Sequence, residues 1–347
     1  YARYHEFVRR AVEARMKGQG IVNVAPGQVE LWDVELPEPG PLDVVVDTRH
    51  SMISPGTERS ILMGERFYGR APGYPADGAP FPQIGGYQKV GVVTAVGPQV
   101  QGPEEGDWVF CTVGASGLAE FPYGGHVRPS VQSQSHVWKL PPGLDPVLVS
   151  GLVLTQVAYN HASRPPVEKG TKALVVGDGL VGLWAAEALQ VRGAAVLLAG
   201  HHDERMACCR LRGGSRSVNT LRQPLEGAAE EFCPGGFPVI VDTLTDTESL
   251  HRDVDLLGHN GHLVAGGFYV KGRNLIDYLK LTGKETTLYM PGGWERSRMD
   301  ATLDLIVSGH VDVAGKITHH FAPADCHKAF DLLLNRREHF LGMIIDW

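Results

Sequence analysis

Three glycines, Gly177, Gly179 and Gly182, follow a short apolar run and have the spacing G-x-G-x-x-G. In such a turn the first glycine makes the bend, the second lets a pyrophosphate approach the backbone, and the third brings a helix close to a strand. The first helical residues, Leu180 and Val181, would present N–H groups without intrahelical partners at the positive end of the helix dipole. The turn is therefore predicted to bind a dinucleotide, and a purely structural glycine turn is the alternative.

The end of the next apolar run indicates which dinucleotide is bound. Folds that bind NAD place Asp or Glu there, about 20 residues beyond the glycines, to accept a hydrogen bond from the ribose 2′-OH. This chain instead has Gly200, His201 and His202, followed by Arg205. The glycine leaves room for a 2′-phosphate and the basic side chains can donate to it, so NADPH is expected rather than NADH. In the alternative reading, Asp203 turns back to hold a 2′-OH, or the histidines only cap the strand.

The elements that position this turn form an alternating pattern of strands and helices. A strand over 173–176, a helix over 180–191 that Gly193 stops, and a strand over 194–199 make one βαβ unit. Further helices are expected at 203–212 and 249–257, and further strands at 239–241, 262–265 and 286–290. This order predicts an α/β fold with a doubly wound parallel sheet. Because such sheets bind ligands at the carboxyl ends of their strands, Gly266 and Gly267 are expected beside the nicotinamide.

The residues outside this pattern favour β structure. Short strands are expected at 21–24, 28–34, 44–48, 90–96 and 108–113, between turns rich in glycine and proline. Residues 1 to about 150 are therefore expected to form an antiparallel, loop-rich domain. Before the first strand, residues 4–17 place apolar side chains at helical spacing, which predicts a short amphipathic helix. A helix over 323–334 and a strand over 343–346 are expected near the end of the chain.

Three short stretches carry a resemblance to the medium-chain dehydrogenase/reductase superfamily. Residues 54–58 read SPGTE where zinc-dependent members have Cys-Gly-Thr-Asp, residues 86–91 read GYQKVG where they have Gly-His-Glu-x-x-Gly, and residues 106–109 read GDWV, which matches Gly-Asp-x-Val. The resemblance implies a GroES-like catalytic domain over 1–154 and 312–347, a Rossmann dinucleotide-binding domain over 155–311, and a homodimer. Together with the ending FLGMIIDW, the pattern is most similar to the zinc-lacking branch that contains bacteriochlorophyllide a dehydrogenase, although Gln88 stands where that branch usually has Glu.

The positions that hold catalytic zinc in this superfamily have lost their ligands. They carry Pro55, Tyr87 and, near the third position, Val153. Zinc is bound by sulfur, imidazole or carboxylate, which proline and valine do not offer. The cysteines, at positions 111, 208, 209, 233 and 326, have no C-x-x-C spacing and indicate neither a zinc ribbon nor a disulfide framework. The protein is therefore expected to work without zinc and to contain no metal site.

Tyr87 is expected to replace the metal, because the resemblance places its hydroxyl near the reacting carbon. A phenol with the usual pKa of about 10 is protonated at neutral pH and can donate to a developing alkoxide. Thr57 aligns with the proton-relay hydroxyl of the zinc enzymes, and Glu58 is a candidate to bind substrate hydroxyls or accept a proton. His126 lies in a loop that faces the substrate cleft in this superfamily, and imidazole donates protons near neutral pH.

Each of these candidates also has a structural reading. Tyr87 is equally explained by one buried hydrogen bond, and Thr57 by an ordinary turn or helix cap. For Glu58 the alternative is an ion pair with Arg59 or Lys89.

The function expected from these residues is the NADPH-dependent reduction of a ketone to a secondary alcohol, reversible and independent of zinc. The substrate is a small carbonyl compound, with a sugar, amino sugar or cyclitol of a natural-product pathway as the favoured class. The first alternative is reduction of an activated C=C bond, as in enoyl and quinone reductases of the same superfamily. The second is an NADPH-binding sensor without catalysis.

Composition and charge exclude several other classes. A chain of 347 residues with 43 % hydrophobic content suggests two domains, each with its own core. The net charge of −7 and the lack of a basic block exclude a nucleic-acid partner. No apolar run approaches the roughly 18 residues of a membrane span, and the first residues lack a secretory pattern, so a cytoplasmic protein is expected.

Overall fold

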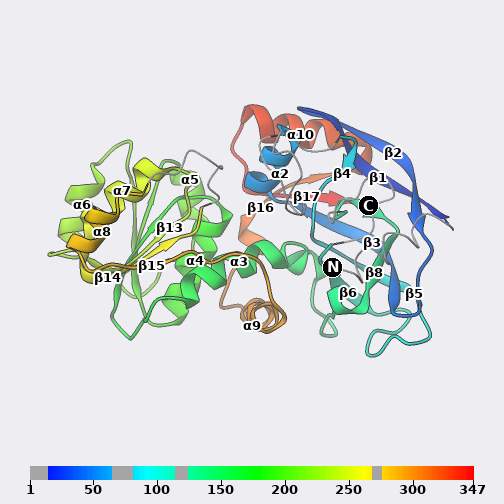
Figure 1. Cartoon of the computed structure of the whole chain (residues 1–347), viewed down its shortest axis with the longest axis horizontal. Coiled ribbons are helices and arrows are strands. Elements are labelled where there is room, and N and C mark those ends of the chain that lie inside the picture. Colours follow the sequence, from blue (N-terminus) through cyan, green and yellow to red (C-terminus); the bar gives the residue numbers. More distant parts are fainter. Residues whose placement is uncertain (1–14, 65–80, 114–123, 268–275) are drawn as a thin grey trace. The chain divides into compact units, whose positions relative to one another are not determined.

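The computed structural model describes residues 15–64, 81–113, 124–267 and 276–347. The chain divides into two compact units, which are coloured along the sequence in Figure 1. We call Tyr1–Leu152 with Ile317–Trp347 the β-rich unit, and Val153–Lys316 the α/β unit. Among the described residues, no helix has both the length and the apolar character that a membrane crossing requires.

The α/β unit contains a parallel sheet of six strands in its described part. Their order is β12 (Arg216–Asn219), β11 (Ala195–Gly200), β10 (Lys172–Val176), β13 (Phe237–Asp242), β14 (Leu257–Ala265) and β15 (Thr287–Tyr289). The chain builds outward from β10 in one direction and then from β13 in the other. This arrangement confirms the doubly wound sheet, and the change of direction marks the carboxyl ends of β10 and β13 as the place where such sheets bind ligands.

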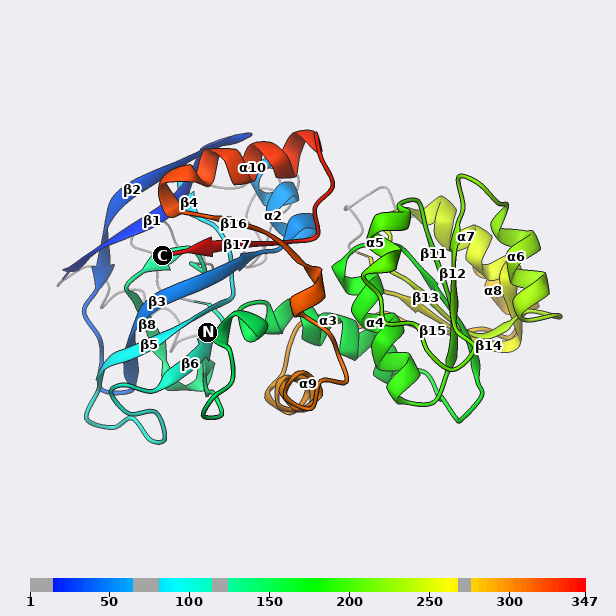
Figure 2. The same cartoon turned by 180° about the vertical axis from the view of Figure 1, so that it is seen from behind.

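The helices of the α/β unit cover its sheet from two sides. They are α3 (Leu152–Ser163), α4 (Leu180–Val191), α5 (Asp203–Ala207), α6 (Leu225–Phe232), α7 (Thr247–Leu256), α8 (Tyr278–Gly283) and α9 (Arg296–Val307). The apolar faces of α6 and α7 share one core with alternate residues of the strands, among them Leu174, Leu197 and Ile240. Helix α4 lies against β10 and β11 on the other side of the sheet, as Figure 2 shows.

The β-rich unit consists of two mainly antiparallel sheets. The larger has the order β16 (Ile317–Phe321), β17 (Gly342–Asp346), β3 (Asp43–Ile53), β5 (Lys89–Val96), β6 (Trp108–Cys111) and β9 (Val137–Lys139), with β8 (Ser130–Ser133) also paired to β3. The smaller has the order β2 (Gln28–Pro37), β1 (Arg15–Ala25) and β4 (Gln83–Ile84), with β7 (Val127–Arg128) also paired to β1. Helices α2 (Pro55–Leu62) and α10 (Cys326–Asn335) pack together beside these sheets.

Several predicted elements are confirmed and a few are wrong. The helix over 180–191 has the expected bounds, and each strand predicted in 21–48 exists but is longer. The predicted helix over 4–17 is wrong at its end, because Arg15–Lys17 begins the long strand β1, and its remaining residues lie outside the described part. Strand β16 and helices α2, α3, α6 and α9 were not predicted. The predicted helix over 203–212 is shorter, since α5 ends at Ala207.

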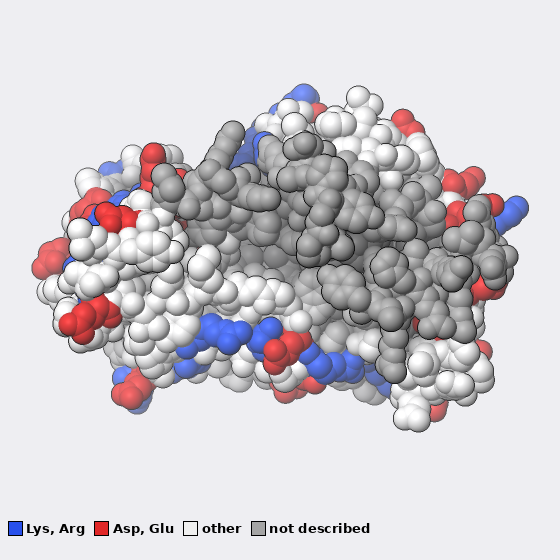
Figure 3. Space-filling model, in the orientation of Figure 1, with Lys and Arg blue, Asp and Glu red and all other residues white. Residues whose placement is uncertain are grey.

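Charged side chains of both signs share the described surface. In the view of Figure 3, Asp and Glu side chains lie among the Lys and Arg side chains. The net charge of −7 is therefore not collected into one acidic face in this view.

A buried ion pair ties the last residues of the α/β unit to helix α4. The Lys316 ammonium lies 2.6 Å from Oε1 of Glu187, and both side chains are almost completely buried. Glu187 also accepts hydrogen bonds from the backbone N–H groups of Asp312 and Arg210. Trp184 also belongs to α4, and its indole donates to the Asp312 carbonyl. One carboxylate thus holds three separate segments together.

We expect Lys316→Met to lower the free energy of unfolding by about 3–5 kcal/mol, because it leaves a buried carboxylate without its cation. Urea unfolding followed by tryptophan fluorescence measures the change. The matched control is Glu231→Gln, which removes one partner of the exposed pair with Arg216. If Lys316→Met unfolds at a urea midpoint as high as that of the control, the ion pair does not have this role.

Candidate dinucleotide site and candidate catalytic residues

The glycine turn has the geometry that a dinucleotide requires. Gly177 ends β10 with φ +115°, a conformation that favours glycine, and a Cβ on Gly182 would lie 1.9 Å from the Gly177 carbonyl oxygen. The backbones of turn and helix therefore touch at a point where no side chain fits. A Cβ on Gly179, by contrast, would meet no atom within 4 Å. The open space beside Gly179 fits a pyrophosphate group.

Helix α4 starts at this open space. Its N-cap is Gly179, which has no side chain to accept from the first turn. The N–H groups at Leu180 and Val181 belong to that turn, which has no intrahelical partners for them. The positive end of the helix dipole adds to the attraction for an anion. The turn and the start of α4 thus have open space for an anion, and binding of the dinucleotide by these residues stays a prediction.

The end of β11 differs from the expectation in one important respect. The room that Gly200 was expected to leave for a 2′-phosphate is filled by Asp178, since a Cβ on Gly200 would lie 2.6–2.9 Å from that side chain. Oδ2 of Asp178 accepts from the backbone N–H groups of His201 and His202, at 2.7 and 2.8 Å, and lies 2.9 Å from Nδ1 of His202. Arg205 Nη1 lies 3.6 Å from Oδ1. Asp178 was not among the predicted site residues, because an acid was expected only after the second strand and Asp178 precedes it.

Asp178 is ionised at neutral pH. Burial by itself raises the pKa of this carboxyl group, but the hydrogen bonds from the His202 ring and from the backbone N–H groups of His202 and His201 outweigh it. Its pKa consequently lies below the ordinary value. His202 and Arg205, which were expected to meet a phosphate, therefore face a negative charge that the protein itself supplies.

Gly266 and Gly267 follow the carboxyl end of β14. The Gly266 N–H donates to the Asp242 carbonyl at 2.7 Å, and a Cβ at this position would lie 2.6 Å from the His161 ring. A Cβ on Gly267 would lie 1.6 Å from the Leu244 carbonyl oxygen. Close packing within the α/β unit accounts for both glycines, and their contact with a nicotinamide stays a prediction.

In the β-rich unit, Tyr87 lies beside the start of helix α2. Its hydroxyl donates to Oγ of Ser54 at 2.6 Å, and both side chains are buried. Ser54 is the N-cap of α2 and directly precedes Pro55, which occupies the first helical position. Two neighbouring hydroxyl groups therefore occupy the region where the resemblance puts zinc ligands. Ser54 was not among the predicted site residues, because nothing in its local sequence marks it.

Glu58 and His126 form a buried pair in the same unit. Oε2 of Glu58 lies 2.8 Å from Nε2 of His126, and Oε1 accepts from the Ser54 N–H at 2.7 Å. On its other side, His126 Nδ1 lies 2.9 Å from Oγ of Ser51, which also accepts from the Trp347 indole. This chain of contacts links the last residue of the protein to the start of α2.

The pairing of Glu58 corrects one detail of the sequence analysis. Glu58 contacts His126 rather than Lys89, whose buried ammonium donates to the Gly124 carbonyl at 2.7 Å. Burial lowers the pKa of Lys89 to about 8. Thr57 lies half-buried in the first turn of α2, and a relay role for its hydroxyl stays a prediction.

The residues at the former zinc positions do not fit a metal ion. The side chains of Pro55 and Val153 offer no ligand atom, and Val153 lies in the apolar core. The Tyr87 hydroxyl is hydrogen-bonded to Ser54. No cluster of three or more His, Cys, Asp or Glu side chains in the described ranges is arranged to hold a metal. Zinc independence therefore stays a prediction that rests on ligand chemistry.

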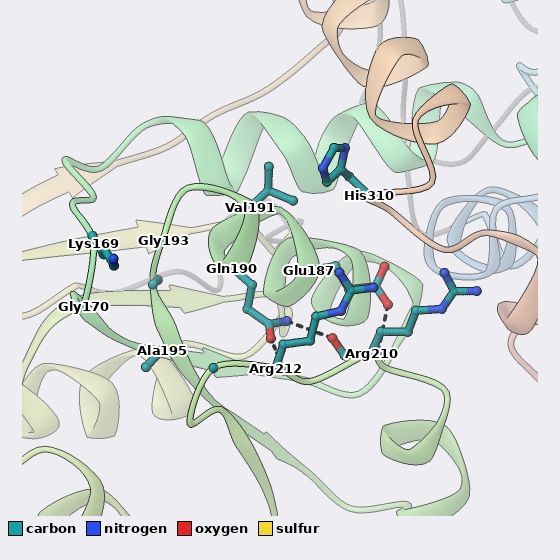
Figure 4. Close-up of a pocket in the computed structure, with 12 residues that line it drawn as sticks. Lys169, Gly170, Glu187, Gln190, Val191, Gly193, Ala195, Arg210, Arg212 and His310 are labelled. Carbon is teal, nitrogen blue, oxygen red and sulfur yellow. Dashed lines mark hydrogen bonds between the residues drawn. The ribbon is translucent and has the colours of Figure 1, made fainter.

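A cavity of about 460 Å³ opens elsewhere in the α/β unit. It is lined by Lys169 and Gly170 before β10, by Gly193 to Ala195 before and at the start of β11, and by Arg210 and Arg212, as shown in Figure 4. The Gln190 side chain holds this last loop by accepting from the Arg212 N–H and donating to the Arg210 carbonyl. The cavity lies at the amino ends of the strands, opposite the edge where the glycine turn lies.

Two substitutions separate the structural glycine from the binding glycine. We expect Gly182→Ala to prevent stable folding, because its Cβ would overlap the Gly177 carbonyl. Gly179→Ala should change the free energy of unfolding by less than about 0.5 kcal/mol, since its Cβ meets open space. The same methyl group should nevertheless weaken NADH and NADPH binding by about tenfold or more, because it occupies the approach of the pyrophosphate. Thermal unfolding and titration of nicotinamide fluorescence measure the two effects, and unchanged cofactor affinity in Gly179→Ala would contradict the assignment.

Comparison with known proteins agrees with this geometry. Residues 181–308 match the zinc-binding dehydrogenase family, in a segment that includes none of the three former zinc positions. The chain is 28 % identical to 2-desacetyl-2-hydroxyethyl bacteriochlorophyllide A dehydrogenase of Rhodobacter capsulatus over 342 residues, which cover 96 % of this chain and 99 % of the relative.

Two solved structures share the fold. One is a protein described as a zinc-binding dehydrogenase from Sinorhizobium meliloti bound to NADP, with TM-score 0.79, 17 % identity and coverage of 96 % of this chain and 100 % of that one. The other is an alcohol dehydrogenase from Escherichia coli complexed with NADH, with TM-score 0.80, 20 % identity and coverage of 95 % and 99 %. The glycine turn, the two-unit fold and these full-length similarities support the assignment of the chain to the medium-chain dehydrogenase/reductase superfamily.

Proposed function

We propose that this protein is a zinc-independent, nicotinamide-dependent oxidoreductase that interconverts a ketone and a secondary alcohol. The observation that carries the proposal is the hydrogen-bonded hydroxyl pair of Tyr87 and Ser54, which lies where two zinc ligands are absent. A relative over almost the whole chain is a dehydrogenase of a hydroxyethyl group, which supports secondary alcohol chemistry. The bound nicotinamide would supply or accept the hydride.

Tyr87 is proposed to move the proton. Its phenol is the stronger acid of the two hydroxyl groups, and in the structure it carries the proton that it donates to Ser54. Donation of this proton to an alkoxide favours the direction of ketone reduction, because oxidation would require a base with a pKa closer to 7. Ser54 accepts from Tyr87 in the structure and so fixes the direction of its hydroxyl group.

Glu58 and His126 are proposed to position this pair rather than to contact the substrate. Both are buried, and Glu58 holds the Ser54 backbone through its N–H group. This replaces the direct roles expected from the sequence, while Thr57 keeps its proposed place in a proton relay.

The finer features of the proposal rest on the sequence. The residues His201, His202 and Arg205 predicted NADPH from the sequence, but the Asp178 carboxylate lies against two of them and opposes a 2′-phosphate. The favoured substrates are polar ketones such as sugars or cyclitols. A homodimer is proposed from the resemblance. Reduction of an activated C=C bond is the second candidate, because a hydride would reach a β-carbon from the same cofactor site. A non-catalytic sensor would bind the cofactor and turn over neither substrate class.

We expect Tyr87→Phe to lower kcat for ketone reduction by about 100-fold or more, since general acid catalysis contributes on that order. Cofactor affinity should not change, because the glycine turn that is proposed to bind the dinucleotide does not include Tyr87. Steady-state rates with a panel of ketones and enones, together with fluorescence titration of the cofactor, measure both quantities.

The matched control is Tyr289→Phe, which removes a hydroxyl group that contacts His262 in the α/β unit. It should leave kcat unchanged. Equal rates for Tyr87→Phe and wild type would remove Tyr87 from the mechanism. Turnover of enones but not of ketones would favour the second candidate function.

A further inference from the structure

The Asp178 carboxylate lies at the carboxyl end of β11, although the residue itself belongs to the turn after β10. Two backbone N–H groups and the ring of His202 surround Oδ2 at 2.7–2.9 Å. These three contacts fix the position of the carboxylate before any ligand arrives. The end of the second strand is where dinucleotide-binding folds place the acid that accepts from the ribose 2′-OH.

Gly200 has a different purpose from the one that the sequence suggested. Any side chain at this position would collide with the Cβ and carboxylate of Asp178. Glycine at the end of β11 therefore admits an acidic side chain from the neighbouring turn. The acid that this position lacks in the sequence is supplied by Asp178, from the turn that follows β10.

The cations around the end of β11 already face carboxylates. Arg205 lies 3.6 Å from Oδ1 of Asp178, and Arg222 forms a 2.8 Å ion pair with Asp203. The Asp203 carboxylate also accepts from the Asn219 amide at 2.9 Å, so it is turned toward those partners. A 2′-phosphate would bring about two more negative charges next to Asp178, whereas ribose hydroxyl groups would donate to it.

We propose that Asp178 is the residue that selects the cofactor, and that it makes this chain bind NADH in preference to NADPH. The carboxylate accepts from the adenosine ribose hydroxyl groups through Oδ1, while Oδ2 stays bonded to the backbone after β11. The inference rests on the proposed nicotinamide-dependent function and reverses the preference expected from His201, His202 and Arg205.

Direct titration of the full-length chain with NADH and with NADPH tests the proposal without a substrate. Wild type should bind NADH about tenfold or more tightly than NADPH. The reason is that the Asp178 carboxylate accepts from a ribose hydroxyl group of NADH but repels the 2′-phosphate of NADPH. In Asp178→Asn, the dissociation constant of NADPH divided by that of NADH should fall toward one or below one. The matched control, Glu204→Gln, removes one negative charge from an exposed residue of α5 and should leave the ratio unchanged.

A second variant gives the opposite sign and does not depend on the folding of Asp178→Asn. Arg205→Gln removes the cation beside Oδ1, so it should increase the preference for NADH. Tighter binding of NADPH by wild type, or an unchanged ratio in folded Asp178→Asn, would overturn the proposal. A weaker preference for NADH in Arg205→Gln than in wild type would also overturn it.

Two further results have distinct meanings. A shift caused by Asp203→Asn but not by Asp178→Asn would transfer cofactor selection to Asp203 and overturn the proposal. Failure of both cofactors to bind wild type would refute the proposed function itself, and the inference about Asp178 with it.

Discussion

The contact between the Gly177 carbonyl and the backbone at Gly182 is the constraint on which the α/β unit depends. Because the two backbones meet where no Cβ fits, helix α4 lies close to β10 and starts immediately beyond the carboxyl end of that strand. This single approach leaves space beside Gly179 and directs the Asp178 side chain toward β11. The ion pair of Lys316 with Glu187 secures α4 further along its length. Dinucleotide binding and its proposed selectivity both follow from how tightly the helix lies against the strand.

The β-rich unit depends on a comparable constraint. Gly86 has φ +76°, and a Cβ there would lie 2.8 Å from the His126 ring, so the segment that carries Tyr87 packs directly against the imidazole. His126 in turn holds Glu58, and Glu58 holds the backbone at Ser54. The C-terminal strand β17 pairs with β3 and brings Trp347 to Ser51, which completes the network. A polar network of this kind, buried at Ser54, Glu58 and His126, can hold two hydroxyl groups in a fixed geometry without a metal.

The sequence was sufficient for the local features of the βαβ unit. The glycine spacing, the β-branched strands and the stop at Gly193 predicted the βαβ unit with the observed bounds of α4, because these signals lie within about 30 residues. The contacts that decide chemistry were harder to predict. Asp178 reaches His202 across 24 positions, and Ser51 reaches Trp347 across 296, so no periodic pattern relates these residues. Gly200 was read as space for a ligand because the sequence does not show which side chain fills that space.

Hydrogen-bonding side chains of the chain itself are proposed to replace a bound cation in hydride transfer. The zinc content of purified protein tests this replacement, when it is determined by elemental analysis on the same sample whose nicotinamide-dependent ketone reduction is assayed before and after chelation. Full turnover is expected with far less than one zinc per chain, with no loss after chelation. Stoichiometric zinc, with activity that disappears on chelation and returns when zinc is added, would show that a bound cation is needed and that the side chains do not replace it.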